Sequence, residues 1–171
     1  ALIETDKVSA LIGPLLSQEV NAVASVAQDK KVPLIILAPQ KKENSSHAYL
    51  FQHSLIPEKE VAQIIQRVRP MKLENFILFF PENSYGRQYK ELFQHWIEKE
   101  TSGKILAEAA YSADLPDFTE TLRQFLVPRL RASRTGLFIP DSFRRVIKIA
   151  EALDTLALAD LQLIGTSRWH H

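Results

Sequence analysis

The side chains best placed to do chemistry in this sequence lie in five short polar turns, each at the end of an apolar run. These turns carry hydroxyl, amide or charged groups beside a helix-start or turn signal, and they cover residues 13–17, 38–42, 81–87, 140–144 and 165–169. Such groups, together with the free N–H groups of a helix N-terminus, suit a carboxylate or another small anion. The turns are therefore the candidate ligand-binding positions.

Most of these side chains also have a purely structural interpretation. Four residues would be good helix N-caps whether or not a ligand binds: Ser17, Ser84, Asp117 and Ser142. Tyr85 beside Gly86 fits a packing role as well as a functional one. The basic residues Lys41 and Lys42, and the group Arg144, Arg145 and Lys148, are expected on solvated faces.

Composition and spacing argue against an enzyme. The 171 residues include no cysteine, which excludes a cysteine nucleophile, a thiolate zinc site and an iron–sulfur cluster. No Gly-x-Ser-x-Gly elbow occurs, no two histidines stand four apart, and five glycines form no phosphate-binding loop. We expect no catalysis, no cofactor and no metal, and keep an α/β enzyme of unknown chemistry only as a remote alternative.

The charge balance and hydropathy exclude two classes of partner. A net charge of +1 gives no electrostatic drive toward nucleic acid or anionic lipid. No apolar run reaches the ~18 residues that a membrane span needs, and no signal peptide opens the sequence. We therefore expect neither a nucleic-acid partner nor a direct membrane span.

The elements that must position the five turns alternate between strand and helix. Apolar runs typical of buried strands cover residues 8–12, 34–37, 76–80, 104–111, 137–139 and 161–164, and segments with helical spacing lie between them. This alternation predicts an α/β fold with parallel sheets covered on both faces. Ligands in such folds bind beyond the carboxyl ends of the strands, where these turns lie.

A polar, turn-rich connection divides the chain. Residues 1–40 form a β-α-β piece, residues 41–56 are expected to cross over between two lobes, and residues 57–165 form a longer βαβαβα run. The connection contains one short apolar patch at Tyr49, Leu50 and Phe51.

Six blocks in order resemble one family. They are VSALIGPLLS (8–17), VPLIILAP (32–39), FILFFPENSYGR (76–87), YSADLPDF (111–118), LFIPD (137–141) and LIGTS (163–167). Together they resemble the type I periplasmic-binding-protein superfamily, nearest to the leucine/isoleucine/valine-binding receptors, with the penicillin-binding protein activators beside them.

The resemblance implies a two-lobed clamp of three-layer αβα lobes, of which this chain is a fragment. Residues 1–40 would be part of the N-terminal lobe, residues 57–165 the second lobe, and residues 166–171 the start of the return to the first lobe. The implied location is periplasmic or otherwise extracytoplasmic. The implied partners are a small polar, anionic or amino-acid-like ligand and a membrane transporter.

Three residues match family positions that hold the ligand. Ser17 matches the serine whose hydroxyl and neighbouring amides hold the ligand carboxylate, and Leu15 lines the same wall. Tyr85 matches a cleft-lining tyrosine of the second lobe.

Other positions depart from the amino-acid receptors. Gln40 and Lys41 follow an apolar turn where the receptors have small hydroxyl residues, and Thr166 and Ser167 stand where the receptors have the acid that holds the ligand ammonium. These departures argue against a binder of free α-amino acids. Asp141, next to Ser142 in another turn, could supply a compensating acid, although its structural role would be a helix cap.

Two functions follow from the resemblance. The first is a non-enzymatic, extracytoplasmic solute-binding domain that holds a small polar ligand at Leu15, Ser17, Gln40, Lys41, Tyr85, Asp141, Ser142, Thr166 and Ser167. The second is a protein-interaction module of the same fold that regulates a cell-wall synthase, that is, a penicillin-binding protein enzyme.

Overall fold

The strands that the apolar runs predict assemble into two separate parallel sheets. A computed structural model describes residues 2–38, 48–53, 56–112, 114–130, 134–158 and 160–170, with the side chain of Ser17 left out. The chain divides into unit 1, Ala1–Ile56, and unit 2, Pro57–His171. Each unit is described by itself.

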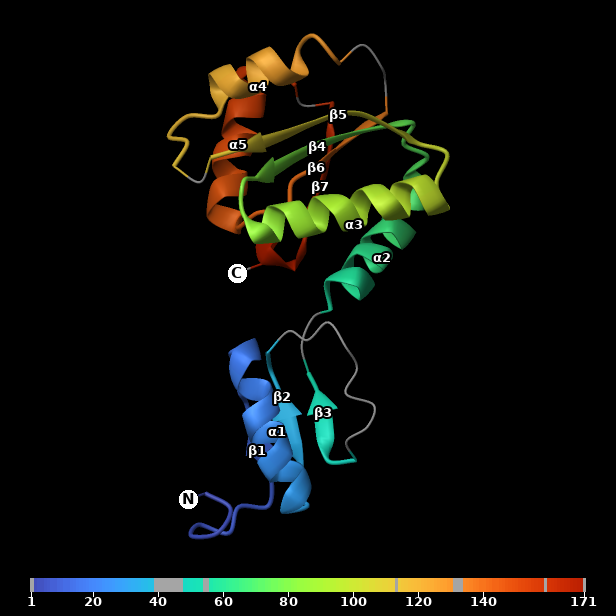
Figure 1. Ribbon diagram of the computed structural model, residues 1–171. Helices are drawn as coiled ribbons and strands as arrows, with labels where there is room; N and C mark the ends of the chain where they lie inside the picture. Colours follow the sequence, from blue (N-terminus) through green and yellow to red (C-terminus); the bar gives the residue numbers. More distant parts are fainter. Residues whose placement is uncertain are drawn as a thin grey trace. The chain divides into compact units, whose positions relative to one another are not determined.

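Unit 1 holds a three-stranded parallel sheet with one helix packed against it (Figure 1). Its elements are β1 (Leu11–Ile12), the 3₁₀ turn η1 (Ser17–Glu19), α1 (Val20–Asp29), β2 (Leu34–Ile36) and β3 (Leu50–Gln52), with strand order β1-β2-β3. The buried residues of α1 pack on Leu34 and Ile36, which lie on one face of β2. On the other face, Ile12 of β1 is 75% exposed and Phe51 of β3 is 56% exposed.

Three details of unit 1 differ from the sequence-based expectation. The first strand is only Leu11–Ile12 rather than residues 8–12. The connection expected over residues 41–56 contains β3, which pairs with β2 in parallel. The N-cap of α1 is Glu19 rather than Ser17, because a 3₁₀ turn comes before the α-helix.

Unit 2 is a four-stranded parallel sheet in the order β5-β4-β6-β7. Its elements are α2 (Pro57–Val68), η2 (Arg69–Met71), β4 (Asn75–Pro81), α3 (Ser84–Glu100), β5 (Lys104–Tyr111), α4 (Thr119–Leu126), β6 (Thr135–Phe138), α5 (Phe143–Thr155), β7 (Gln162–Ile164) and η3 (Ser167–Trp169). Continuous burial from Phe76 to Pro81 is typical of a central parallel strand, which β4 is.

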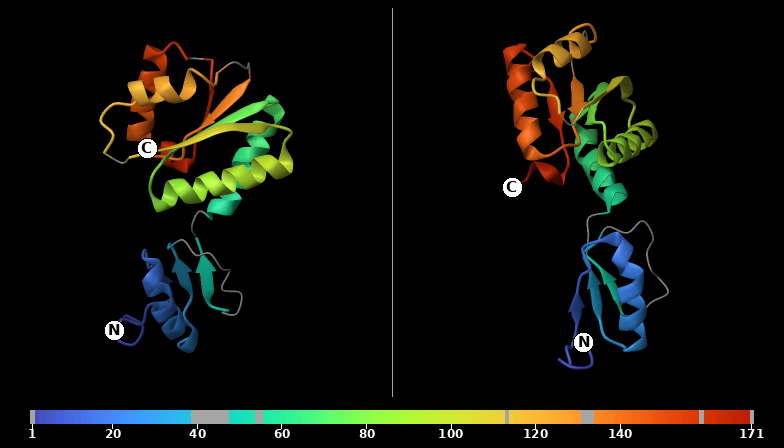
Figure 2. Two further views of the ribbon diagram at one scale, coloured as in Figure 1. Left: turned by 45° about the horizontal axis from the view of Figure 1, so that its top comes forward. Right: turned by 60° about the vertical axis from the view of Figure 1, so that its left-hand side comes forward.

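Helices cover both faces of this sheet, which confirms the three-layer α/β architecture. Helices α2 and α3 pack on the face formed by Phe76, Leu78 and Phe80 of β4. Helices α4 and α5 pack on the opposite face, around Ile77 and Phe79. The right-hand view of Figure 2 shows the sheet between these two layers.

The strand order fixes where a ligand crevice can form in unit 2. From β4 the chain goes to β5 on one side, and then crosses to β6 and β7 on the other. The switch point therefore lies beyond the carboxyl ends of β4 and β6, the place where ligands bind in open parallel sheets. The turns that begin at Pro81, Ile139 and Gly165 meet at this edge, which we call the carboxyl edge.

Two helix starts at the carboxyl edge are built differently from the expected serine caps. The N-cap of α3 is Asn83, whose side chain accepts a hydrogen bond from the Gly86 N–H at 2.8 Å, so the prediction for Ser84 was wrong. Ser142 does hold the N-cap position of α5, but its hydroxyl makes no capping hydrogen bond.

Of the helices in the described ranges, none combines the length and the apolar character needed to cross a membrane.

Candidate functional site

The carboxyl edge of unit 2 brings together residues from α2, α3 and the turn after β7. We call this group the edge cluster, and its members are Glu60, Tyr85, Tyr89, Thr166, Ser167 and Arg168. The strand order puts β6 between β4 and β7, so the contact between Tyr85 and Thr166 crosses the end of β6. It joins two predicted ligand residues that lie 81 positions apart.

Tyr85 is held in place by Thr166, Tyr89 and Arg168. Its hydroxyl and the Thr166 hydroxyl are hydrogen-bonded at 2.9 Å, and Thr166 is 5% exposed. Its ring lies 4.3 Å from the Tyr89 ring, centroid to centroid, and the Arg168 guanidinium lies 3.7 Å from the Tyr85 centroid. Gly86 permits this position, because a Cβ there would stand 2.1 Å from the Pro81 carbonyl oxygen.

Glu60 connects the first turn of α2 to the turn after β7. One carboxylate oxygen accepts a hydrogen bond from the Tyr89 hydroxyl at 2.5 Å, and the other accepts from the Ser167 N–H at 2.6 Å. Both oxygens therefore serve internal donors. Charge-assisted bonds of this kind are stronger than neutral ones, so Glu60 fixes the backbone at Ser167.

The two tyrosines of the edge cluster stay protonated over the ordinary pH range. Burial raises the pKa of Tyr85 above its usual value, and the hydrogen bond with Thr166 and the neighbouring Arg168 charge only partly offset this. Burial also raises the pKa of Tyr89, and the hydrogen bond to Glu60 raises it further. Tyr89 therefore remains a hydrogen-bond donor to Glu60.

The turn after β7 is held by hydrogen bonds and close packing. The Trp169 indole N–H donates to the Ile139 carbonyl oxygen at 3.1 Å, and the Trp169 backbone N–H donates to the Thr166 carbonyl oxygen at 3.0 Å. The Trp169 ring also lies directly on Gly165, where a Cβ would come within 2.0 Å of a ring atom. Together with Glu60, these contacts fix both ends of the segment that carries Ser167 and Arg168.

A second polar group at the same edge surrounds Asp141, which is 6% exposed. Its carboxylate accepts hydrogen bonds from the Tyr111 hydroxyl at 2.8 Å and the Ser142 N–H at 2.6 Å, and it pairs with the Arg145 Nε at 3.2 Å. Burial raises the pKa of Tyr111, and the Asp141 carboxylate adds to the effect. Arg145 also donates to the Ser112 carbonyl oxygen at 3.0 Å.

This arrangement changes the interpretation of two residues. Arg145 is half-buried and ion-paired, so the expectation that it lies on a solvated face was wrong, whereas Arg144 is exposed as expected. The charge of Asp141 is balanced by Arg145, and its oxygens are used by internal donors. The geometry thus gives Asp141 a structural role and leaves it poorly suited to hold a ligand ammonium.

The remaining predicted ligand residues belong to unit 1. Leu15 is 73% exposed in the turn after β1, and Ser17 begins η1 in unit 1. Gln40 and Lys41 lie outside the described residues. Their roles stay predictions.

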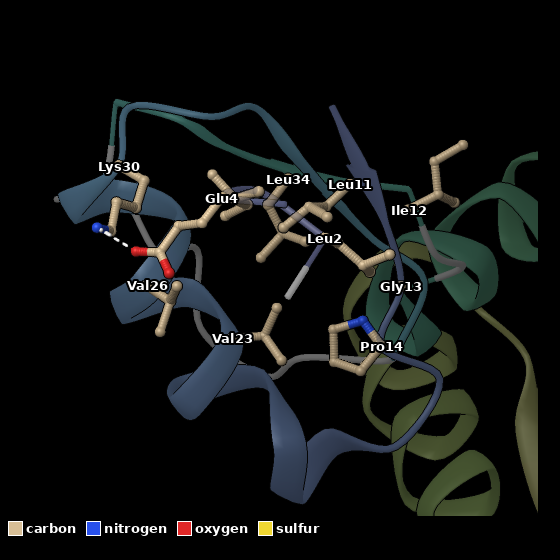
Figure 3. A pocket seen from close by; sticks show the side chains of 11 residues that line it. Leu2, Glu4, Leu11, Ile12, Gly13, Pro14, Val23, Val26, Lys30 and Leu34 are labelled. Atoms are coloured by element: carbon tan, nitrogen blue, oxygen red, sulfur yellow. Dashed lines mark hydrogen bonds and ion pairs between the residues drawn. The ribbon is translucent and has the colours of Figure 1, made fainter. Parts of the chain in front are cut away.

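Unit 1 contains an apolar pocket of about 410 Å³ between its N-terminal segment, β1 and α1 (Figure 3). Leu2, Leu11, Val23 and Leu34 line it, and a 2.7 Å ion pair between Glu4 and Lys30 lies at its rim. None of the predicted ligand residues that the structure describes lines this pocket.

Three edge-cluster residues were not predicted as site residues: Glu60, Tyr89 and Arg168. Arg168 could have been predicted from the rule that ligands bind beyond the carboxyl ends of the strands (the strand-end rule), because it lies in the turn at residues 165–169. Glu60 and Tyr89 carry no such signal, since they lie on amphipathic helices before and after β4. Within the described ranges, no group of three His, Cys, Asp or Glu side chains could hold a metal ion.

Solved structures share this fold at low sequence identity. A branched-chain amino acid ABC transporter periplasmic ligand-binding protein from Burkholderia xenovorans matches with a TM-score of 0.73 and 15% identity, over 96% of this chain and 44% of that one. The substrate-binding protein LivJ from Streptococcus pneumoniae, in complex with isoleucine, matches with a TM-score of 0.60 and 21% identity, over 96% and 45%.

A third structure is a solute-binding protein of an ABC transporter from Rhodopseudomonas palustris in complex with p-hydroxybenzoic acid. It matches with a TM-score of 0.62 and 18% identity, over 98% of this chain and 45% of that one. This chain thus spans less than half the length of each of these proteins.

Comparison with curated protein sequences finds no match. The family model described as periplasmic binding protein matches residues 1–155. This match extends over most of the chain, and the α/β architecture and the solved structures agree with it. The chain belongs to the periplasmic binding protein family and has the type I fold of that family.

Proposed function

We propose that this chain is the part of a solute-binding protein that contacts the ligand through the carboxyl edge of unit 2, without chemical change of the ligand. The observation that carries the proposal is the edge cluster, in which Glu60 and the Trp169 contacts fix the segment of Ser167 and Arg168. Polar groups that are held in position at a topological switch point suit ligand binding, because they lose little conformational entropy when the ligand binds.

The edge cluster offers binding groups but no reactive set. Among the described residues of the cluster, the only carboxylate, Glu60, accepts hydrogen bonds from the Tyr89 hydroxyl and the Ser167 N–H, and burial keeps Tyr89 protonated. Its open groups are the Arg168 guanidinium and the Ser167 hydroxyl, which has no hydrogen-bond partner among the described side chains. These groups support recognition of a small polar molecule.

The candidate ligands are small organic acids and amino acids. Among the similar structures, one binds isoleucine and one binds p-hydroxybenzoic acid. Family membership supports an extracytoplasmic location and delivery of the ligand to an ABC transporter. We include both in the proposal.

Calorimetric titration of the full chain with isoleucine and with p-hydroxybenzoate tests the proposal. We expect heat of binding with at least one of them. Thr166→Val, which keeps the side-chain shape but removes the hydroxyl bonded to Tyr85, should weaken binding several-fold. Glu98→Gln is the matched control, because Glu98 is exposed near the other end of α3.

Absence of binding for these and for a wider set of small acids would contradict the proposal. It would favour the alternative, a protein-interaction module of the same fold. In that case Thr166→Val should leave capture of a cell-envelope protein partner unchanged.

A further inference from the structure

Two groups of the protein lie against the Tyr85 ring. The Tyr89 ring centroid lies 4.3 Å away and the Arg168 guanidinium carbon lies 3.7 Å away. Both distances are close to van der Waals contact with the ring. The ring surface that these two groups cover is not available for stacking on a ligand.

The group exposed in its place is the guanidinium of Arg168. Arg168 is exposed, and no carboxylate of the described residues forms an ion pair with it. A guanidinium can stack on an aromatic ring and still donate from its N–H edge, which matches the two oxygens of a carboxylate. Stacking on Tyr85 thus orients the side chain while leaving its donors available.

The backbone that carries Arg168 is fixed on both sides. On one side the Ser167 N–H donates to Glu60 at 2.6 Å. On the other side Trp169 is held through the Thr166 and Ile139 carbonyl oxygens. A cation that is already held in position loses less conformational entropy on ligand binding than a cation on an unconstrained loop.

Within the edge cluster, the charges favour an anion over a zwitterion. Its one carboxylate, Glu60, already accepts hydrogen bonds from Tyr89 and Ser167. Helices α3 and α5, which begin at this edge, carry exposed Arg87 and Arg144 in their first turns, whereas the exposed acids Glu58 of α2 and Glu82 before α3 are not members of the edge cluster. A ligand ammonium would have to compete with two internal donors for Glu60.

We propose that Arg168 is the specificity-determining residue of this site and selects ligands that carry a carboxylate without an α-ammonium. The Ser167 hydroxyl is placed to be a second donor to the same carboxylate. The inference rests on the proposed function, because it names the ligand class of the proposed site.

The test is calorimetric titration with three probes that share one skeleton and differ in charge: phenylacetate, phenylacetamide and phenylglycine. The full chain should bind phenylacetate about tenfold more tightly than the neutral amide, as expected of a charge-assisted pair. Phenylglycine should bind more weakly than phenylacetate, because its ammonium is left without an acid.

Arg168→Gln should remove the preference for phenylacetate over phenylacetamide. Arg168→Lys, which keeps the charge without the planar fork, should retain only part of the preference. Glu58→Gln is the control, because Glu58 is an exposed acid in the first turn of α2 and its substitution should not reduce phenylacetate binding.

Two results overturn the inference in distinguishable ways. Equal binding of phenylacetate by the full chain and by Arg168→Gln, or tighter binding of phenylglycine, overturns the role of Arg168 and leaves the proposed function intact. Binding of none of the three probes, together with none of the wider set of small acids, overturns both.

Discussion

Glu60 shows how one side chain can organise a site without touching a ligand. It accepts from a tyrosine hydroxyl of α3 and from a backbone N–H in the turn after β7, 107 residues away. The carboxylate thus joins three segments of unit 2 at one point. Glu60 serves the site by holding other residues in position, because both of its oxygens already accept hydrogen bonds within the protein.

Glu60→Gln should destabilise unit 2 by about 1–3 kcal/mol, because a neutral amide offers one acceptor where the carboxylate offers two. The change in the free energy of unfolding can be measured by urea denaturation followed by circular dichroism. Glu58→Gln on the same helix turn is the control and should have little effect. Equal stabilities of the two variants would contradict the positional role of Glu60.

The tyrosines of unit 2 predict how its stability depends on alkaline pH. Burial raises the pKa of Tyr85, Tyr89 and Tyr111 in the folded chain above the unfolded value of about 10. A raised folded pKa stabilises the fold below the unfolded pKa, and this stabilisation is lost as the pH rises from there through the folded pKa.

The contribution of these three groups to stability should therefore be fully present and independent of pH near neutrality, and stability should fall from about pH 10 upward. Phenolate absorbance from Tyr85, Tyr89 and Tyr111 should rise with unfolding rather than before it. Ionisation of these three tyrosines near pH 10 while the chain remains folded would contradict this expectation.

At the scale of the elements, the turn between β7 and η3 depends on one glycine. A Cβ on Gly165 would come within 2.0 Å of the Trp169 ring. Trp169 cannot move away without losing the 3.1 Å hydrogen bond to the Ile139 carbonyl oxygen. Close packing of backbone and indole is therefore what orients the segment that presents Arg168.

Gly165→Ala should destabilise unit 2 by about 1–3 kcal/mol through this overpacking. Circular dichroism during urea denaturation measures the effect. In a Trp169→Leu background, which makes room for the added methyl group, the cost of Gly165→Ala should shrink. The same cost in both backgrounds would show that the contact with Trp169 is not its cause.

The elements of unit 2 could be predicted well from the sequence because their patterns are strong. The buried run of β4 and the helical spacing of α3 gave the right element types, and the strand-end rule pointed to Tyr85, Thr166 and Ser167. β3 was missed because it has three residues within a polar connection. β2 and β7 are equally short, but each lies in a longer, mostly apolar run, whereas polar residues surround the short patch at β3.

The rest of the site could not be predicted because it depends on tertiary packing. The role of Glu60 arises only when the first turn of α2 meets the turn after β7. The structural role of Asp141 arises from Tyr111 and Arg145, which come from β5 and α5. Neither contact can be recognised from the local sequence. Arg168, by contrast, lies in one of the turns that were predicted to bind a ligand.

At the scale of the whole molecule, the two units differ in how much core they form. Unit 2 has a buried cluster on each face of its sheet. Unit 1 has one smaller cluster under α1, and Ile12 and Phe51 are exposed on its other sheet face. The account of ligand binding rests on unit 2, where a complete three-layer architecture supports the edge cluster.

The most direct test of this account is a nuclear magnetic resonance titration of the full, ¹⁵N-labelled chain with phenylacetate. The account predicts that the largest shifts fall on the backbone amides of Thr166, Ser167 and Arg168 and on the Arg168 Nε–H. Phenylacetamide should shift the same signals less at equal concentration. Shifts that leave the segment from Thr166 to Arg168 unchanged would contradict the central claim that the carboxyl edge of unit 2 binds the ligand.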